Sequence, residues 1–292
     1  SGLHSFPTRR SSDLHFPHSS KETKMNISTT SKGSIYYEKI GDGFPLVILH
    51  AMGTDHRSMK MWLEPLFKEI QGFERIYVDL PAHGQSTITH DFRSSDDMHQ
   101  NILEFINQVL PNKQFSLIGS SYGGYLAQGI LHYKRDFVKS ICLLAPALHI
   151  RERTLPKKVI FREASEKIME LDADIRTAFE TLMVHQTEAN LRTFLREIQP
   201  GRLLANKNFL MSNWREQGYF LKDAPFHDQT SLLQPATIIV GKLDSICGFA
   251  DHSFFLEKFI HAELVLLEDA GHLLHIEKRK EVHSLIIDWL VR

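Results

Sequence analysis

The sequence predicts an α/β fold in which helices cover both faces of a mostly parallel central sheet. Several short apolar runs, such as residues 46–49, are continuous rather than alternating, which is typical of strands that are buried on both faces. Segments with helical spacing separate these runs. The alternation stops between about residues 149 and 228 and then resumes. This interruption predicts an insertion between two halves of one sheet.

The first half of the predicted sheet begins with a hairpin. Residues 35–40 and 45–50 are expected strands, and Gly41-Asp42-Gly43 between them is a typical turn sequence. The helix expected over residues 96–110 has its apolar side chains on one stripe and ends at Pro111. The other elements expected here are a helix over 54–70, strands over 75–80, 115–118 and 140–145, and a helix over 125–133.

Residues 149–228 are rich in charge and contain no buried-strand run, so we expect this insertion to be helical. Four of its apolar side chains either line a substrate pocket or form a small core, with the core favoured. They are Phe209, Met211, Trp214 and Tyr219. The second half of the sheet then follows, with strands expected over 236–240 and 264–267 and helices over 251–260 and 280–291.

The first 24 residues show no periodic pattern. Residues 4–14, HSFPTRRSSDL, resemble the translation of a short-read sequencing adapter. The segment also lacks the apolar middle region of a signal peptide. We therefore expect residues 1–24 to be a disordered tail or an assembly artefact, with the native chain starting at Met25. Such a start predicts a cytoplasmic protein.

Charge and composition exclude several classes of partner. The formal net charge is −1 and the acidic and basic residues are interspersed, which argues against nucleic acid or a membrane surface as a partner. No apolar run approaches the roughly 18 residues of a membrane span. Cys142 and Cys247 are expected to stay reduced. The 17 histidines include no zinc-binding spacing, so we expect no metal site.

The pentapeptide Gly119-Ser120-Ser121-Tyr122-Gly123 is the strongest motif in the chain. It lies between an expected strand and an expected helix. Glycines two residues before and after a serine allow a tight turn that lifts the hydroxyl clear of the sheet. The frame G-x-S-x-G therefore selects Ser121 as a candidate nucleophile and excludes Ser120.

A serine hydroxyl needs a general base, and the base needs a group that orients it. We expect both groups in the loops after the last two strands. His272 follows the last strand, and it is preferred over His275 because Gly271 precedes it. Asp244 follows the preceding strand. The rival acids near the end of the insertion, Asp223 and Asp228, are more typical of helix caps or solvent-facing positions.

The order Ser121, Asp244, His272 resembles that of the α/β-hydrolase fold superfamily, and the resemblance covers nearly all of residues 25–292. It implies an oxyanion hole formed by the backbone N–H groups of Tyr122 and Met52.

Two further stretches are similar to the family pattern but differ from it at one or two positions. Relatives usually have His-Gly where this chain has His50-Ala51. Residues 79–86, DLPAHGQS, are similar to the family stretch D-x-x-G-x-G-x-S but carry Ala82 and His83. We expect this second stretch to support the structure, and His50 and His83 to make structural hydrogen bonds.

The resemblance implies a serine hydrolase that works through an acyl-enzyme and needs no cofactor. Serine at position 121 argues against the epoxide-hydrolase and haloalkane-dehalogenase branches, which use a carboxylate nucleophile. Residues 149–228 would be a helical cap over the site for a small-molecule substrate with an ester, thioester, lactone or activated C–C bond. The alternative is a signalling protein that binds a small ligand on the same fold with little turnover. The oligomeric state stays open.

Overall fold

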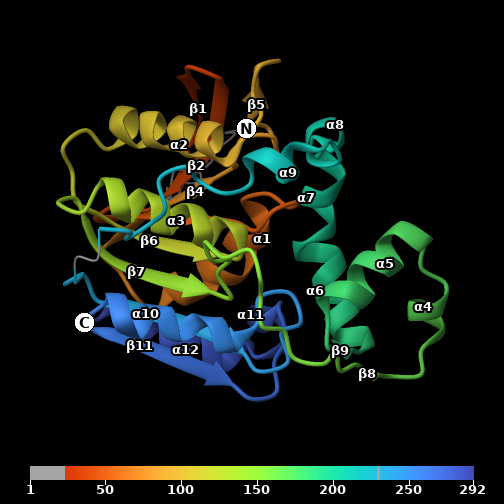
Figure 1. Ribbon diagram of the computed structural model, residues 1–292. Helices are drawn as coiled ribbons and strands as arrows, with labels where there is room; N and C mark the ends of the chain where they lie inside the picture. The colour runs from red at the N-terminus through yellow and green to blue at the C-terminus, as the bar shows by residue number, and fades with distance from the viewer. Residues whose placement is uncertain (1–23, 229–230) are drawn as a thin grey trace, which may run out of the picture.

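The computed structural model describes residues 24–228 and 231–292 (Figure 1). The predicted tail, residues 1–24, lies outside the described residues except for Lys24. The described residues form an α/β structure whose central sheet has helices on both faces, which confirms the predicted fold class.

Within the described residues the central sheet has nine strands, in the order β1-β2-β4-β3-β6-β7-β10-β11, with β5 paired to β2. The five pairings from β4 to β11 are all parallel, whereas β2 pairs antiparallel with β1, β4 and β5. The strands are β1 (Lys24–Thr30), β2 (Gly33–Ile40), β3 (Phe44–Leu49), β4 (Phe73–Val78), β5 (Thr87–Ile88), β6 (Phe115–Ser120), β7 (Val138–Leu144), β10 (Ala236–Gly241) and β11 (Ala262–Leu267).

The predicted hairpin between β2 and β3 is wrong. Strand β4 lies between them, and β2 instead forms a hairpin with β1. The four residues at the end of β3, Leu46 to Leu49, are at most 1% exposed. A strand this apolar is buried most completely between two parallel neighbours, which here are β4 and β6. The glycine-rich turn therefore carries the chain past β4 rather than folding β3 back onto β2.

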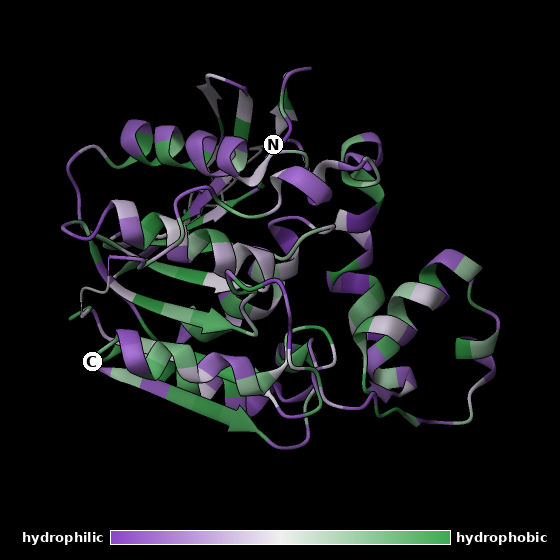
Figure 2. Ribbon diagram, viewed as in Figure 1, coloured by the Kyte–Doolittle hydropathy of each residue, from purple (hydrophilic) through white to green (hydrophobic). Residues whose placement is uncertain are grey.

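Helices cover the two faces of the sheet with separate hydrophobic clusters. Helices α2 (Ser95–Val109), α3 (Tyr122–Tyr133) and α10 (Phe254–Lys258) pack on one face. Helices α1 (Arg57–Leu63) and α12 (Arg279–Leu290) pack on the other. Figure 2 shows apolar residues along the strands and polar residues on the outer side of α2. This pattern agrees with an apolar interior between the layers.

The helix ends follow local chemistry. Ser94 caps α2, since its side chain accepts a hydrogen bond from the Asp97 backbone N–H at 3.1 Å. The helix expected over 54–70 divides into α1 and a 3₁₀ segment, η1 (Glu64–Lys68), that has Pro65 in its first turn. Among the described residues no helix is both long and apolar enough to cross a membrane.

The elements from β8 to α7 (residues 161–204) lie beyond the strand ends toward which β6, β7 and β11 point in Figure 1, whereas the chain after α9 (residues 214–218) runs back over the sheet face that α2 and α3 cover. Phe179 and Phe194 pack edge to face at 5.5 Å in the core of the elements from β8 to α7, which Leu273 and Ile276 from the last part of the chain join. The elements of residues 149–228 are β8 (Phe161–Arg162), α4 (Glu166–Met169), α5 (Ala173–Leu182), β9 (His185–Gln186), α6 (Glu188–Glu197), α7 (Gln199–Leu204), α8 (Lys207–Leu210) and α9 (Trp214–Gly218).

A buried cluster of charged side chains fixes the loops beside the sheet. His56 contacts Asp79 through Nδ1 at 2.8 Å and Glu38 through Nε2 at 3.0 Å. Asp79 also accepts a hydrogen bond from the Gln85 backbone N–H. A Cβ on Gly84 would lie 2.1 Å from the Asp79 carboxylate, so only glycine fits there. This contact explains the glycine in the DLPAHGQS stretch and agrees with the structural role expected for it.

The His56 contacts predict a pH-dependent stability. Burial by itself would lower the pKa of His56, but hydrogen bonds to Asp79 and Glu38 raise it from 6.5 to about 9. The raised pKa contributes stability that is complete below pH 6.5 and is lost as the pH rises through 9. We expect the free energy of unfolding to fall by roughly 3 kcal/mol over this window, as measured by urea denaturation.

The variant His56→Gln should lack this decline. His90→Gln is the matched control, because His90 is exposed, and it should keep the decline. An equal decline in His56→Gln would contradict the assignment.

Candidate active site

Ser121 lies in a strained turn between β6 and α3. Its backbone has φ 51° and ψ −115°, a left-handed conformation that a residue with a Cβ rarely adopts. A Cβ on Gly123 would lie 2.4 Å from the His50 carbonyl oxygen, and one on Gly119 would lie 2.7 Å from the Gly123 carbonyl oxygen. The two glycines therefore let the turn approach β3 and α3 closely enough to present the serine at the strand end.

The structure brings the predicted serine, histidine and aspartate together. His272 Nε2 lies 3.0 Å from Ser121 Oγ, and His272 Nδ1 lies 2.8 Å from Asp244 Oδ2. The three residues follow β6, β10 and β11, whose carboxyl ends meet at the same edge of the sheet. Asp244 is fully buried, and His272 is 9% exposed.

The hydrogen bonds at Asp244 fix the tautomer of the imidazole. An ionised carboxylate only accepts, so Nδ1 of His272 donates to Asp244 and Nε2 is left to accept the proton of Ser121. The other oxygen of Asp244 accepts from the backbone N–H groups of Ile246 and Cys247, at 2.8 and 2.9 Å. Burial alone would raise the pKa of Asp244, but His272 and these two N–H groups hold it below its usual value.

The rival acids do not reach this histidine. Asp223 pairs with His132 at 3.2 Å and with His227 at 2.6 Å. Asp228 pairs with Arg135 at 2.8 Å. Both carboxylates therefore belong to a different cluster.

Glu277 holds the loop that carries His272. One of its oxygens accepts from the Gly271 backbone N–H at 2.9 Å. The other accepts from the N–H groups of Val184 and His185 in the insertion, at 3.1 and 2.5 Å. Burial raises the pKa of Glu277 above its usual value. This carboxyl group, which the sequence analysis missed, connects the histidine loop to the insertion.

The backbone N–H groups of Met52 and Tyr122 stay candidates for the expected oxyanion hole. Both residues line the cavity at Ser121. Neither N–H has a hydrogen-bond acceptor within residues 24–228 and 231–292. The loop after β3 departs from the family sequence, and its conformation rests on Gly53, which has φ 85° and donates its N–H to His83 Nε2 at 2.8 Å.

His50 and His83 make structural hydrogen bonds, as expected. His50 Nε2 accepts from the Leu80 backbone N–H at 3.0 Å, and His83 Nδ1 donates to the Pro81 carbonyl oxygen at 2.9 Å. Burial lowers the pKa of His83 to about 3. The two rings therefore stay neutral and hold the loops that follow β3 and β4.

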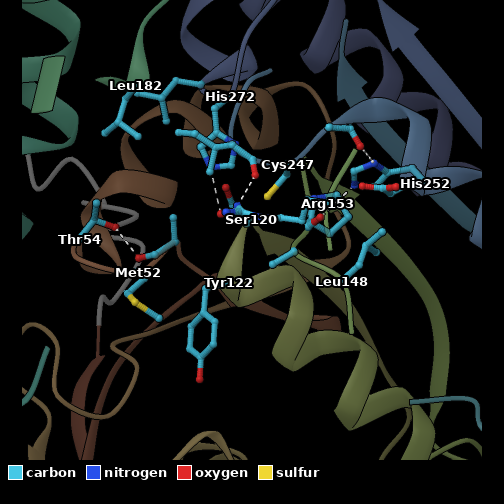
Figure 3. A pocket seen from close by; sticks show the side chains of 18 of the residues that line it. Met52, Thr54, Ser120, Tyr122, Leu148, Arg153, Leu182, Cys247, His252 and His272 are labelled. Atoms are coloured by element: carbon cyan, nitrogen blue, oxygen red, sulfur yellow. Dashed lines mark hydrogen bonds between the residues drawn. The ribbon is translucent and has the colours of Figure 1, made fainter. Parts of the chain in front are cut away.

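A cavity of about 470 Å³ opens beside Ser121. Figure 3 shows His272 directed toward the end of β6, with Cys247 and Met52 on opposite sides. The insertion contributes Leu182, Ile198 and Tyr219 to the cavity wall. Cys247 is buried next to the serine, and burial raises its pKa to about 12. We did not expect this thiol at the site from the sequence, although Cys247 lies three residues after the predicted acid.

The four apolar side chains of the insertion have different positions. Phe209 and Trp214 are buried in the cluster that covers the α2 and α3 face of the sheet. Tyr219 lines the cavity, and Met211 is 83% exposed. Two of the four side chains therefore belong to the core and one to the pocket, whereas Met211 belongs to neither.

A family model described as alpha/beta hydrolase fold matches residues 45–279. The chain belongs to this family. As an α/β hydrolase it is an enzyme, and the matched residues include the turn at Ser121.

Alignments with similar proteins cover most of this α/β hydrolase. The AB hydrolase superfamily protein YisY of Bacillus subtilis is 26% identical over 265 residues, covering 89% of this chain and 96% of the relative. Human monoacylglycerol lipase ABHD6 is 24% identical over 258 residues, covering 84% and 74%. The crystal structure of an alpha/beta superfamily hydrolase from Oenococcus oeni has a TM-score of 0.80 at 26% identity, covering 91% of this chain and 98% of that chain.

The close approach at Gly123 predicts that alanine is not tolerated there. We expect Gly123→Ala to lower the free energy of unfolding by more than about 2 kcal/mol, because the added Cβ meets backbone oxygens that cannot move aside. Urea denaturation followed by circular dichroism measures the change.

Gly129→Ala on the same helix is the matched control. Its Cβ would meet side-chain atoms of His99 and Leu221 at 2.9 and 3.0 Å, and these can shift. A loss in Gly129→Ala as large as that in Gly123→Ala would contradict the explanation.

Proposed function

We propose that the enzyme is a serine hydrolase that cleaves a small ester or related acyl compound through a Ser121–His272–Asp244 triad. The observation that carries the proposal is the hydrogen-bond chain from Asp244 Oδ2 through His272 to Ser121 Oγ, at 2.8 and 3.0 Å. These distances lie within the range needed for proton transfer between a nucleophile and its base.

In the first half of the reaction Ser121 Oγ attacks the acyl carbon while His272 Nε2 takes the hydroxyl proton. Asp244 stabilises the imidazolium that forms and keeps the ring in place. The carbonyl oxygen becomes an oxyanion, which the N–H groups of Met52 and Tyr122 receive. A donor of this kind lowers the barrier by about 3 kcal/mol. The leaving group then takes the proton from His272 and departs, which leaves an acyl-enzyme.

In the second half a water molecule attacks the acyl carbon. His272 takes a proton from the water and returns it to Ser121 Oγ as the ester bond to the serine breaks. The acid product leaves and the enzyme regains its starting state. The full cycle adds one water across the substrate bond and needs no group beyond the residues named.

The size and lining of the cavity support a small-molecule substrate. Its volume of about 470 Å³ is in the range of ordinary small-ligand sites. Residues 149–228 act in this proposal as a helical cap, because Leu182, Ile198 and Tyr219 from them contribute to the cavity wall. The human relative named above is a monoacylglycerol lipase, which favours an ester among the bonds considered.

The nucleophile can be tested with a fluorophosphonate probe and 4-nitrophenyl acetate. We expect the native enzyme to react with the probe and to turn over the ester steadily, because the hydroxyl is activated by its base. Ser121→Ala should lose both activities, whereas Ser120→Ala should keep the probe reaction. Labelling without turnover on a panel of esters would instead favour a ligand-binding signalling protein.

The orienting acid can be tested with Asp244→Asn. The amide is close in shape to the carboxylate but no longer enforces the reactive tautomer, so kcat should fall by about three to four orders of magnitude. Asp223→Asn is the matched control and should keep kcat within about twofold. Steady-state hydrolysis of 4-nitrophenyl acetate gives the comparison, and a larger loss in Asp223→Asn would overturn the choice of acid.

A further inference from the structure

Three arginine side chains line the cavity at Ser121. Arg151 and Arg153 come from the segment that follows β7, and Arg215 comes from α9. Asp251 is the one carboxylate among the residues that line the cavity in the described part of the chain. Three positive charges therefore face one negative charge around the cavity, although the whole chain has a formal net charge of −1.

These arginines have no carboxylate partner within residues 24–228 and 231–292. No carboxylate oxygen there lies within 4.0 Å of their guanidinium nitrogens. Eight of the other eleven arginines among the described residues have such a partner, as Arg75 has Glu64 at 2.5 Å, whereas Arg93, Arg192 and Arg196 have none.

Other contacts hold the three guanidinium groups in place. Arg153 Nη1 donates to the Ile246 carbonyl oxygen at 2.5 Å. Arg215 Nη2 lies 2.7 Å from the sulfur of Met52. Arg151 lies over the ring of Phe220 at 4.9 Å. Each contact uses few of the five N–H donors of a guanidinium group, so donors remain for an anionic ligand.

Arg153 and Arg215 are placed on either side of the nucleophile. Arg153 is anchored to the loop after β10, and Arg215 to the loop after β3. In the sheet β6, which ends at the serine turn, lies between these two strands. Figure 3 shows Arg153 and Met52 on opposite sides of Ser120. The two guanidinium groups are therefore anchored to loops on opposite sides of the strand that leads into Ser121.

Asp251 does not neutralise this arrangement. Its Oδ2 accepts a hydrogen bond from the Thr154 backbone N–H at 2.8 Å, and it makes no ion pair with Arg153. The rival explanation for the arginines is packing, in which their stems and planes cover aromatic rings. Packing explains the ring contacts of Arg151 and of Arg215, which lies over the Trp214 ring at 6.0 Å. It does not explain why Arg153 donates to a carbonyl oxygen in the loop after β10.

We propose that the substrate carries a carboxylate in addition to the bond that is cleaved, and that Arg153 and Arg215 bind it as specificity-determining residues. The inference rests on the proposed hydrolase function and adds the charge of the substrate to it. The hydrolysis step is unchanged: water adds across the ester bond, and the carboxylate is not consumed.

A binding experiment tests the inference without turnover. The probes are the mono-4-nitroanilide of adipic acid and its neutral counterpart, in which a primary amide replaces the free carboxylate. Calorimetry at pH 7.5 is done with native enzyme and with Ser121→Ala. We expect the anionic anilide to bind roughly tenfold more tightly or better, as a charged hydrogen bond provides. The preference should shrink as sodium chloride rises from about 50 to about 500 mM.

A kinetic experiment identifies the arginines. The substrates are 4-nitrophenyl adipate and 4-nitrophenyl adipamate, and the readout is the ratio of their kcat/KM values, in which a general loss of activity cancels. Arg153→Gln and Arg215→Gln should each lower the ratio about tenfold. Arg192→Gln is the matched control, since Arg192 is exposed on α6 and lies outside the cavity. It should leave the ratio unchanged.

The two experiments separate the two proposals. Equal binding of the two anilides, no binding, or tighter binding of the neutral one overturns the inference. An unchanged ratio in both Arg153→Gln and Arg215→Gln also overturns it. If both esters are hydrolysed and the neutral one is preferred, the proposed function is supported and the inference about the substrate carboxylate is contradicted. Tighter binding of the anionic anilide without hydrolysis of either ester contradicts the proposed function and supports the inference.

Discussion

The conformation of the turn at Ser121 is the constraint on which the rest of the site depends. A serine held at φ 51° projects its hydroxyl from the end of β6 toward the loop after β11. The turn exists only because Gly119 and Gly123 allow backbone contacts closer than a Cβ would permit. The parallel sheet brings the other two groups to the same edge, because Asp244 and His272 follow neighbouring parallel strands. The reactive geometry is therefore a product of sheet topology and one strained turn.

Surrounding polar groups hold the loops of the site at fixed positions. Glu277 accepts three backbone N–H groups and connects the His272 loop to the insertion. His83 holds Gly53 in the loop that carries Met52. Each of these side chains is buried or nearly so, and each has its hydrogen-bonding groups satisfied by backbone. Such contacts position the atoms that meet substrate, as the preorganisation of an active site requires.

Much of this arrangement could be predicted from the sequence, because it follows from local patterns. The glycine frame around Ser121 and the apolar runs before Asp244 and His272 are readable in the linear chain. The pairing of β2 with β4 instead of β3 could not be predicted, because it depends on which strand is buried most completely in the folded sheet. The arginines around the cavity could not be predicted either. Arg153 and Arg215 are 62 residues apart in the sequence and carry no motif, and only the folded chain brings them to one cavity.

Identifying the atom that carries the acyl group during turnover tests the role of Ser121 most directly. Native enzyme mixed with 4-nitrophenyl acetate, quenched in acid within milliseconds and digested, should show an acetylated peptide by mass spectrometry. We expect the acetyl group on Ser121 and no adduct in His272→Gln. An acetyl group on the neighbouring thiol of Cys247, or turnover without any acylated peptide, would contradict this role of Ser121.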